Sequence, residues 1–142
     1  MTVRPVPPGF HTVTPYLAVH CATELLAFTQ AAFGAEPSEV VRDGEGRVRH
    51  AQVRIGDSIV MLGEVPADQT PYPATLYLYV EDVDAWFRRA VEAGGAVLEE
   101  PEDKFYGDRT AAVQDAQGNR WYMATHVEDV PEDELRRRAA QG

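Results

Sequence analysis

The feature of this chain that most constrains its fold is an internal repeat. The apolar run Leu17–Val19 returns at Leu78–Val80, and the glycine at the end of the next helical stretch, Gly34, returns at Gly95. The separation is 61 residues in both cases. Self-similarity at a fixed distance indicates copies of one structural unit, so the sequence predicts a duplicated module.

A second pair of segments extends the repeat, since 55–61 and 117–123 both read as strand, turn and strand. Residues 66–73 carry three of the ten prolines and form the expected linker between the copies. We therefore expect a single domain over residues 1–142, built from two modules. The expected modules cover about 12–65 and 74–126, with a short C-terminal tail at 127–142.

Hydrophobic periodicity predicts the order strand, helix, strand, strand, strand in each module. Apolar residues at helical spacing predict helices at 23–33 and 83–93, and the tail is expected to form a surface helix at 130–138. The charged loop at 100–107 is expected to be long enough to act as a lid. The expected strands are 13–19, 38–42, 47–55, 58–62, 75–80, 97–99, 110–114 and 120–125.

Composition narrows the range of partners. The formal net charge is −10, with 23 acidic against 13 basic residues, so a phosphate backbone would be repelled and nucleic acid is not expected as a partner. No segment approaches the ~18 to 20 apolar residues of a membrane span. The first residues lack the apolar core of a signal peptide, so the expected location is the cytoplasm. The lone Cys21 excludes an internal disulfide.

Five segments carry a recognisable signature: Pro15–Val19, Ala32–Ala35, His50–Ser58, Tyr106–Arg109 and Asp115–His126. Together they resemble the vicinal oxygen chelate superfamily, which includes glyoxalases, bleomycin-resistance proteins and extradiol dioxygenases, and are most similar to its PhnB-like branch. The resemblance spans about residues 12–127. It implies an α+β, glyoxalase-like fold, in which two βαβββ modules form a half-open curved barrel with helices outside and a ligand cleft on the concave face.

Strand alternation then selects the side chains expected to face that cleft. The predicted ligand-binding residues are Thr14, Tyr16, Gln52, Arg54, Thr75, Tyr77, Tyr79, Arg109 and Tyr122. His50 is the candidate catalytic residue, because an imidazole suits proton transfer near neutral pH. Tyrosines offer a flat apolar face and one polar tip, although strand propensity alone also favours them. Arg109 could instead pair structurally with Asp108.

Metal-dependent members of the superfamily use a histidine on the first strand, a histidine or glutamate on the fifth and a glutamate on the eighth. The resemblance places Thr14, Thr75 and Tyr122 at those positions. Zinc, iron, manganese and nickel prefer imidazole, carboxylate or thiolate ligands. We therefore expect no metal and no cofactor.

Three functions are compatible with these features. The favoured one is a metal-free small-molecule-binding protein that sequesters an aromatic or cationic compound such as an antibiotic. The first alternative is a metal-independent isomerase, cyclase or lyase that uses His50 or a tyrosine as acid or base. The second is a glyoxalase-like metalloenzyme with displaced ligands. We also expect a homodimer, because Pro15 marks a strand edge that needs covering, and neither nucleic acid nor a membrane as a partner.

Overall fold

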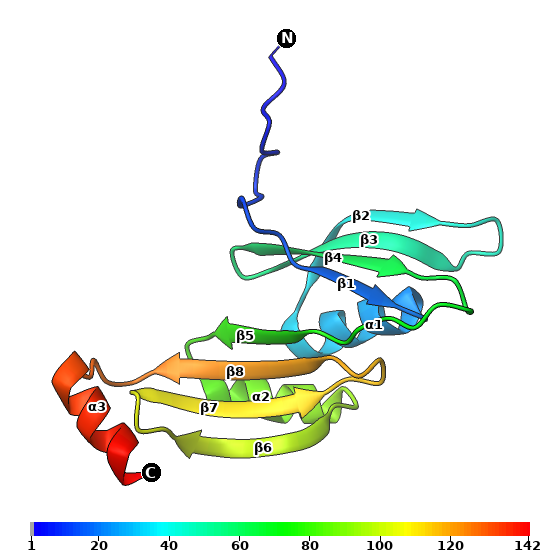
Figure 1. The fold of residues 1–142 in the computed structure, drawn as a ribbon. Helices are drawn as coiled ribbons and strands as arrows, with labels where there is room; N and C mark the ends of the chain where they lie inside the picture. Colours follow the sequence, from blue (N-terminus) through cyan, green and yellow to red (C-terminus); the bar gives the residue numbers. More distant parts are fainter. Residues whose placement is uncertain (1) are drawn as a thin grey trace. The chain divides into compact units, whose positions relative to one another are not determined.

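Each copy of the repeat forms one four-stranded sheet with a helix against it (Figure 1). The structure is a computed structural model and describes residues 2–142. The chain divides into two units: unit 1 contains residues up to Ala74 together with 116–118, and unit 2 contains 75–115 and 119–142. The predicted α+β class and the repeated βαβββ order are confirmed.

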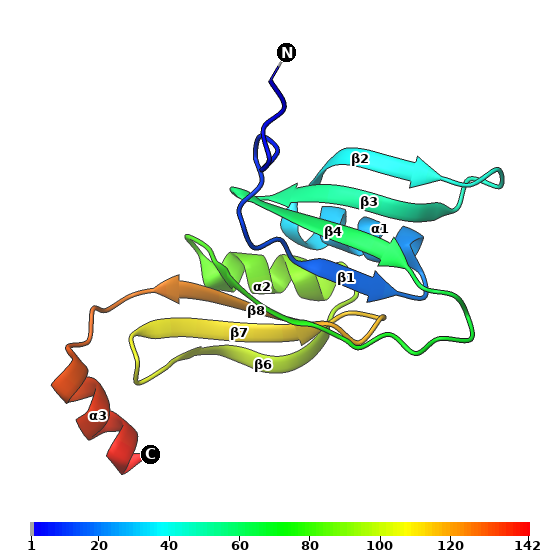
Figure 2. The same ribbon diagram turned by 45° about the horizontal axis from the view of Figure 1, so that its top comes forward.

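Unit 1 has the sheet order β1-β4-β3-β2, with β1 parallel to β4 and the other pairs antiparallel. Its elements are β1 (Tyr16–Val19), α1 (Ala22–Phe33), β2 (Glu36–Arg42), β3 (Val48–Ile55) and β4 (Ser58–Glu64). The helix α1 lies along one face of this sheet (Figure 2) and buries Leu25, Leu26 and Phe33. It ends at Gly34, whose φ of 64° is left-handed, as the glycine at the end of the helical pattern predicts.

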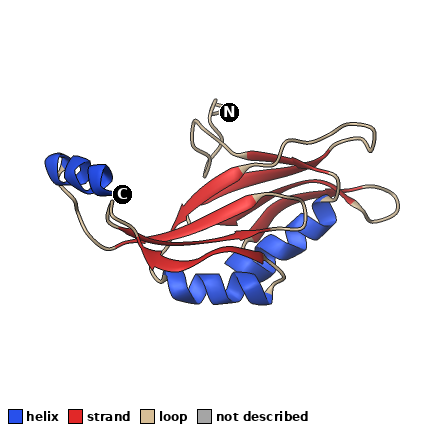
Figure 3. Cartoon of the chain, turned by 60° about the horizontal axis from the view of Figure 1, so that its bottom comes forward, coloured by secondary structure: helices blue, strands red, loops and turns tan. Residues whose placement is uncertain are grey.

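Unit 2 repeats the arrangement with the order β5-β8-β7-β6. Its elements are β5 (Thr75–Tyr79), α2 (Val83–Glu92), β6 (Ala96–Asp103), β7 (Asp108–Gln114), β8 (Arg120–His126) and α3 (Glu132–Gln141). In this unit α2 lies against one face of the sheet (Figure 3). Asp82 caps α2, because its side-chain oxygen accepts a hydrogen bond from the Ala85 amide at 3.2 Å.

The loop expected at 100–107 is shorter than predicted, and it is not long enough to act as a lid. The strand β6 continues to Asp103 and pairs with β7 as far as Asp103 opposite Arg109, so a short turn is left between the two strands. Proline and closely spaced charges argue against a strand in the sheet interior. At a sheet edge they are tolerated, and β6 is an edge strand.

The alternation expected along the strands is observed in both cores. In unit 1, Leu17 and Val53 are buried, and in unit 2 Trp121 and Met123 are fully buried. Side chains at the intervening positions therefore point to the face opposite the helix. Among the helices of residues 2–142, none has both the length and the apolar composition needed to span a bilayer.

Candidate ligand-binding site

Three tyrosines lie together on the face of the unit 2 sheet opposite α2, and we call Tyr77, Tyr79 and Tyr122 the tyrosine face. Tyr77 and Tyr122 are register partners on β5 and β8, with nearly parallel rings whose centroids are 6.2 Å apart. The Tyr79 ring meets that of Tyr77 edge-on at 5.3 Å. Tyr77 is 43% exposed and Tyr79 is 66% exposed. The surface is therefore aromatic and accessible, which suits a flat ligand.

A buried carboxylate fixes two of these tyrosines. Asp108 begins β7 and is 3% exposed. Its Oδ2 accepts a hydrogen bond from the Tyr77 hydroxyl at 2.7 Å and another from the Tyr79 hydroxyl at 3.0 Å. Hydrogen bonds to a charged group are stronger than neutral ones, so both rings are held in defined orientations.

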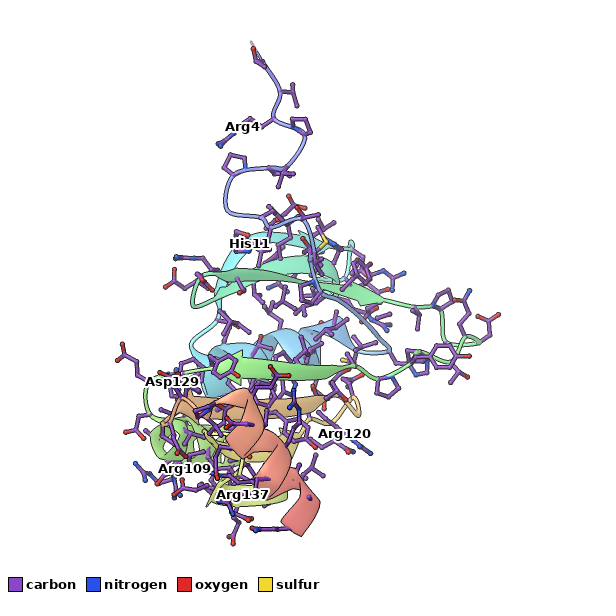
Figure 4. The ribbon with its side chains drawn as sticks, turned by 60° about the vertical axis from the view of Figure 1, so that its left-hand side comes forward. Arg4, His11, Arg109, Arg120, Asp129 and Arg137 are labelled. Atoms are coloured by element: carbon purple, nitrogen blue, oxygen red, sulfur yellow. The ribbon has the colours of Figure 1, made fainter. Side chains whose placement is uncertain are left out.

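The other oxygen of Asp108 contacts a histidine. The β7–β8 register places His126 opposite Asp108, and the Nδ1 of His126 lies 2.9 Å from the Oδ1 of Asp108. The Nε2 lies 2.7 Å from Oδ1 of Asp129, which follows β8 (Figure 4). Hydrogen bonds to Asp108 and then to Asp129 raise the pKa of His126, so the cluster favours the doubly protonated imidazolium.

The protonation states of the other members follow from the same contacts. Burial raises the pKa of Tyr77, and the hydrogen bond to Asp108 raises it further. The hydrogen bond to Asp108 also raises the pKa of Tyr79. Burial acts to raise the pKa of the Asp108 carboxyl. Hydrogen bonds from Tyr77, His126 and Tyr79 outweigh this effect and hold that pKa below its usual value. Near neutral pH the site thus holds an anion and two neutral phenols.

The other two predicted ligand-binding residues of unit 2, Thr75 and Arg109, lie on opposite faces of its sheet. Thr75 alternates with Leu76 and shares the face of Tyr77. Arg109 lies on the α2 side of the sheet, where its Nε is 2.9 Å from Asp84 and its NH1 is 3.2 Å from Asp103 (Figure 4). Its guanidinium therefore pairs with these two carboxylates and not with Asp108, and it lies apart from the tyrosine face.

Most of the predicted residues of unit 1 lie on its sheet: Tyr16, His50, Gln52 and Arg54 are in β1 and β3, whereas Thr14 precedes β1. The rings of Tyr16 and His50 lie 6.0 Å apart. Tyr16 extends across Gly63, where a Cβ atom would meet its hydroxyl at 2.0 Å. Arg54 is ion-paired with Glu36 at 2.7 Å, and the Thr14 hydroxyl donates to the carbonyl of His11 at 3.2 Å.

A groove of ≈ 550 Å³ adjoins these residues in unit 1. The segment before β1 forms one wall with Phe10 and His11 (Figure 4), and the sheet contributes Gln52 and Met61. Thr14 and Glu39 also line it. Thr14 and Gln52 thus line this groove, whereas His50 is not among its lining residues.

The side chains at the superfamily's metal-ligand positions do not fit a metal ion. Thr14, Thr75 and Tyr122 offer two alcohols and a phenol, which bind divalent transition ions feebly unless deprotonated. Within residues 2–142, no group of three or more histidine, cysteine, aspartate or glutamate side chains is arranged to hold one.

Sequence reasoning missed Asp108 and His126 as members of the site. One signal could have found them: the turn at 115–119 joins two antiparallel strands, and counting outward from it pairs Asp108 with His126. The hydrophobic pattern carries no such information, because it predicts faces and not cross-strand register.

Comparison with known proteins identifies the family. A sequence profile of the Glyoxalase/Bleomycin resistance protein/Dioxygenase superfamily matches residues 10–123. The chain belongs to this superfamily. One relative of this superfamily member, the uncharacterized protein Mb0911c of Mycobacterium bovis (strain ATCC BAA-935 / AF2122/97), is 34% identical over 134 residues, covering 87% of this chain and 88% of its own. The uncharacterized protein Rv0887c of Mycobacterium tuberculosis (strain ATCC 25618 / H37Rv) is also 34% identical, covering 87% and 79%.

Solved structures agree on the fold of this superfamily member. TioX from Micromonospora sp. ML1 superposes with a TM-score of 0.71 at 24% identity, covering 82% of this chain and 99% of TioX. A glyoxalase/bleomycin resistance protein/dioxygenase family enzyme from Burkholderia phytofirmans PsJN gives 0.68 at 18% identity, covering 80% and 97%. At these identities the similarity establishes a glyoxalase-like fold, and function has to be argued from the site.

Proposed function

We propose that this superfamily member, in its PhnB-like branch, binds a small aromatic or cationic molecule on the tyrosine face and sequesters it, as would suit a compound such as an antibiotic. The observation that carries the proposal is the Asp108 network. It holds the rings of Tyr77 and Tyr79 in place while 43% and 66% of their surfaces stay exposed. A surface fixed before the ligand arrives loses less entropy on binding.

The chemistry of this surface favours flat or positively charged ligands. Aromatic rings stack on planar molecules and attract cations to their faces. The formal net charge of −10 adds a long-range attraction for cations. Binding on this face needs no metal ion, which agrees with the alcohol and phenol groups of Thr14, Thr75 and Tyr122 at the superfamily's ligand positions.

The enzymatic alternative receives less support from the geometry. An acid or base must exchange a proton with its substrate near neutral pH. Tyr77 and Tyr79 have raised pKa values and keep their protons. Both nitrogens of His126 are engaged by carboxylates, and His50 is not among the residues that line the groove of unit 1. Binding without turnover is therefore the function we favour.

A matched pair of variants tests the proposal. A library of aromatic amines and heteroaromatic fragments is screened by ligand-observed NMR, and the best binder is titrated against Tyr79→Ala and Tyr72→Ala. Tyr72 lies in the linker, is 90% exposed and is absent from the tyrosine face, so it controls for loss of an exposed ring. We expect Tyr79→Ala alone to weaken binding by roughly threefold to tenfold. Equal affinities for the two variants would contradict the proposed site.

We also propose that the protein forms a homodimer. In unit 1 the strands β1 and β2 are at the sheet edges, and in unit 2 β5 and β6 are. Edge strands are commonly covered, and a second copy is the simplest cover. Light scattering at micromolar concentration should give twice the 15.7 kDa mass of the chain. A monomer mass would contradict this.

A further inference from the structure

We propose that Asp108 makes the tyrosine face selective for ligands that donate hydrogen bonds, by turning the hydroxyl protons of Tyr77 and Tyr79 inward. The inference rests on the proposed function and adds the chemical class of the ligand. Asp108 is therefore a specificity-determining residue, although its own carboxylate is buried beneath the tyrosines.

The donors and acceptors at the site determine where each proton lies. An ionised carboxylate can only accept hydrogen bonds, and a phenol has a single proton to donate. Both hydroxyls lie within hydrogen-bonding distance of Oδ2 of Asp108, at 2.7 and 3.0 Å. Each tyrosine must therefore donate its proton to Asp108. What each oxygen can offer a ligand is a lone pair.

The second carboxylate oxygen of Asp108, Oδ1, does not change the direction of the hydrogen bonds from the tyrosines. Oδ1 is occupied by Nδ1 of His126 at 2.9 Å, and Nε2 of the same ring is held by Asp129. The imidazole thus meets Asp108 as a donor. Tyr77, Tyr79 and His126 all donate to the Asp108 carboxylate, so the two hydroxyl protons point toward Asp108 and not toward solvent.

Tyr79 is the principal acceptor of the two tyrosines. The Tyr77 hydroxyl makes the shorter hydrogen bond to Asp108, at 2.7 Å against 3.0 Å for Tyr79, and the Tyr77 ring contacts both the Tyr79 and the Tyr122 rings. Tyr79 is also the more exposed residue, at 66% against 43% for Tyr77, so we assign the accepting role mainly to Tyr79.

The ligand class follows from combining this acceptor with the rings. A fitting ligand is flat and carries an N–H or O–H at its edge: a protonated aromatic amine, an amidine, or a heteroaromatic ring with an N–H. Molecules of the same shape that present only acceptors, such as carbonyls, ethers or carboxylates, would leave the Tyr79 oxygen facing another lone pair.

Two neutral isosteres test the inference directly. Indole and benzofuran have almost the same shape, but indole carries a ring N–H where benzofuran carries an ether oxygen. Both are titrated by NMR, with the amides of β5 and β8 as the readout. We expect wild-type protein to bind indole about threefold to tenfold more tightly, the value of one net hydrogen bond.

Asp108→Asn should abolish or reverse that preference. The asparagine carbonyl would stay with the Nδ1–H of His126, which turns its amide N–H groups toward the tyrosines. The amide then donates, and the hydroxyl protons rotate outward. Asp129→Asn removes the same charge from the opposite side of His126, where the carboxylate is fully exposed, and should keep the preference for indole. Tyr79→Phe keeps the ring but should lose the preference.

The outcomes separate this inference from the proposed function. Equal binding of indole and benzofuran, with both shifting the amides of β5 and β8, would overturn the inference and leave the binding site standing. Binding of neither fragment, or binding elsewhere, would overturn both. If Asp108→Asn fails to fold by circular dichroism, Tyr79→Phe decides: a retained indole preference would overturn the inference.

Discussion

Glu64 in β4 and Thr125 in β8 perform the same structural task in the two units. The Oε2 of Glu64 accepts a hydrogen bond from the amide of Ala22 at 3.0 Å, and Oγ1 of Thr125 accepts one from the amide of Val83 at 2.9 Å. These amides begin α1 and α2, where a helix has no internal partners for them. Both donor and acceptor recur 61 residues apart, so the repeat preserves a contact while changing its chemistry from a carboxylate to a hydroxyl.

The Glu64 contact should depend on pH. Burial acts to raise the pKa of Glu64, but hydrogen bonds from Ala22, Arg47 and Arg49 outweigh it and hold that pKa below its ordinary value. A lowered folded-state pKa stabilises the protein above the unfolded value of 4.5, and this stabilisation is lost as the pH falls through the folded-state pKa. Glu64→Gln should cost about 1–3 kcal/mol at pH 7. Urea unfolding at pH 7 and pH 3 should show the difference from wild type shrinking in acid.

The hydrogen bonds of Thr125 should contribute to the free energy of unfolding by an amount that does not depend on pH. Thr125→Val keeps the shape of the side chain but removes the acceptor for Val83 and the donor to the carbonyl of Val80. We expect a loss of about 0.5–2 kcal/mol in the free energy of unfolding. The same loss should appear at pH 7 and at pH 4.5. A loss that vanished in acid would contradict the assignment, because a hydroxyl does not titrate there.

Asp115, the first residue of the turn at 115–119, should be a stability determinant of unit 2. Asp115 is buried, and its Oδ2 accepts a hydrogen bond from the fully buried indole of Trp121 at 2.7 Å. Asp115→Ala removes this acceptor and the bond to the Asn119 amide, and should cost about 1–3 kcal/mol in urea unfolding. Asp57 lies in the corresponding exposed turn of unit 1, so Asp57→Ala should change stability by no more than about 0.5 kcal/mol.

His126 should titrate above the ordinary value of 6.5. Hydrogen bonds to Asp108 and Asp129 raise its pKa, so NMR titration of its ring protons should show a higher midpoint, and Asp129→Asn should lower that midpoint. A folded-state pKa above the unfolded value stabilises the protein fully below pH 6.5, and this stabilisation is lost as the pH rises through the folded-state pKa. A midpoint at or below 6.5 would show that the imidazole does not bridge the two carboxylates in solution.

The repeat explains why much of the fold was predictable. Faces follow from alternation, so the burial of Leu17 and Trp121 and the exposure of Tyr77 could be predicted from strand patterns. The full length of β6 could not, because Pro101 and its acidic neighbours look like a loop. Their charges are compatible with a strand only because that strand is an edge, which is a property of the assembled sheet.

The candidate site was predictable in part for the same reason. Tyr77, Tyr79 and Tyr122 follow from alternation, and the structure places them on one face. Asp108 and His126 depend on the pairing of two strands and on burial of a carboxylate, which periodicity does not report. The side of Arg109 was open from sequence, and its ion pair with Asp84 of α2 decides it.

The most direct test of the proposed binding face is the location of a bound ligand. An aromatic amine is titrated into uniformly ¹⁵N-labelled protein, and amide shift changes are mapped onto the chain. We predict that the largest changes fall in β5 and β8, around Tyr77, Tyr79 and Tyr122. Changes confined to the helices, or to the groove of unit 1 near Phe10 and Met61, would contradict binding on the tyrosine face.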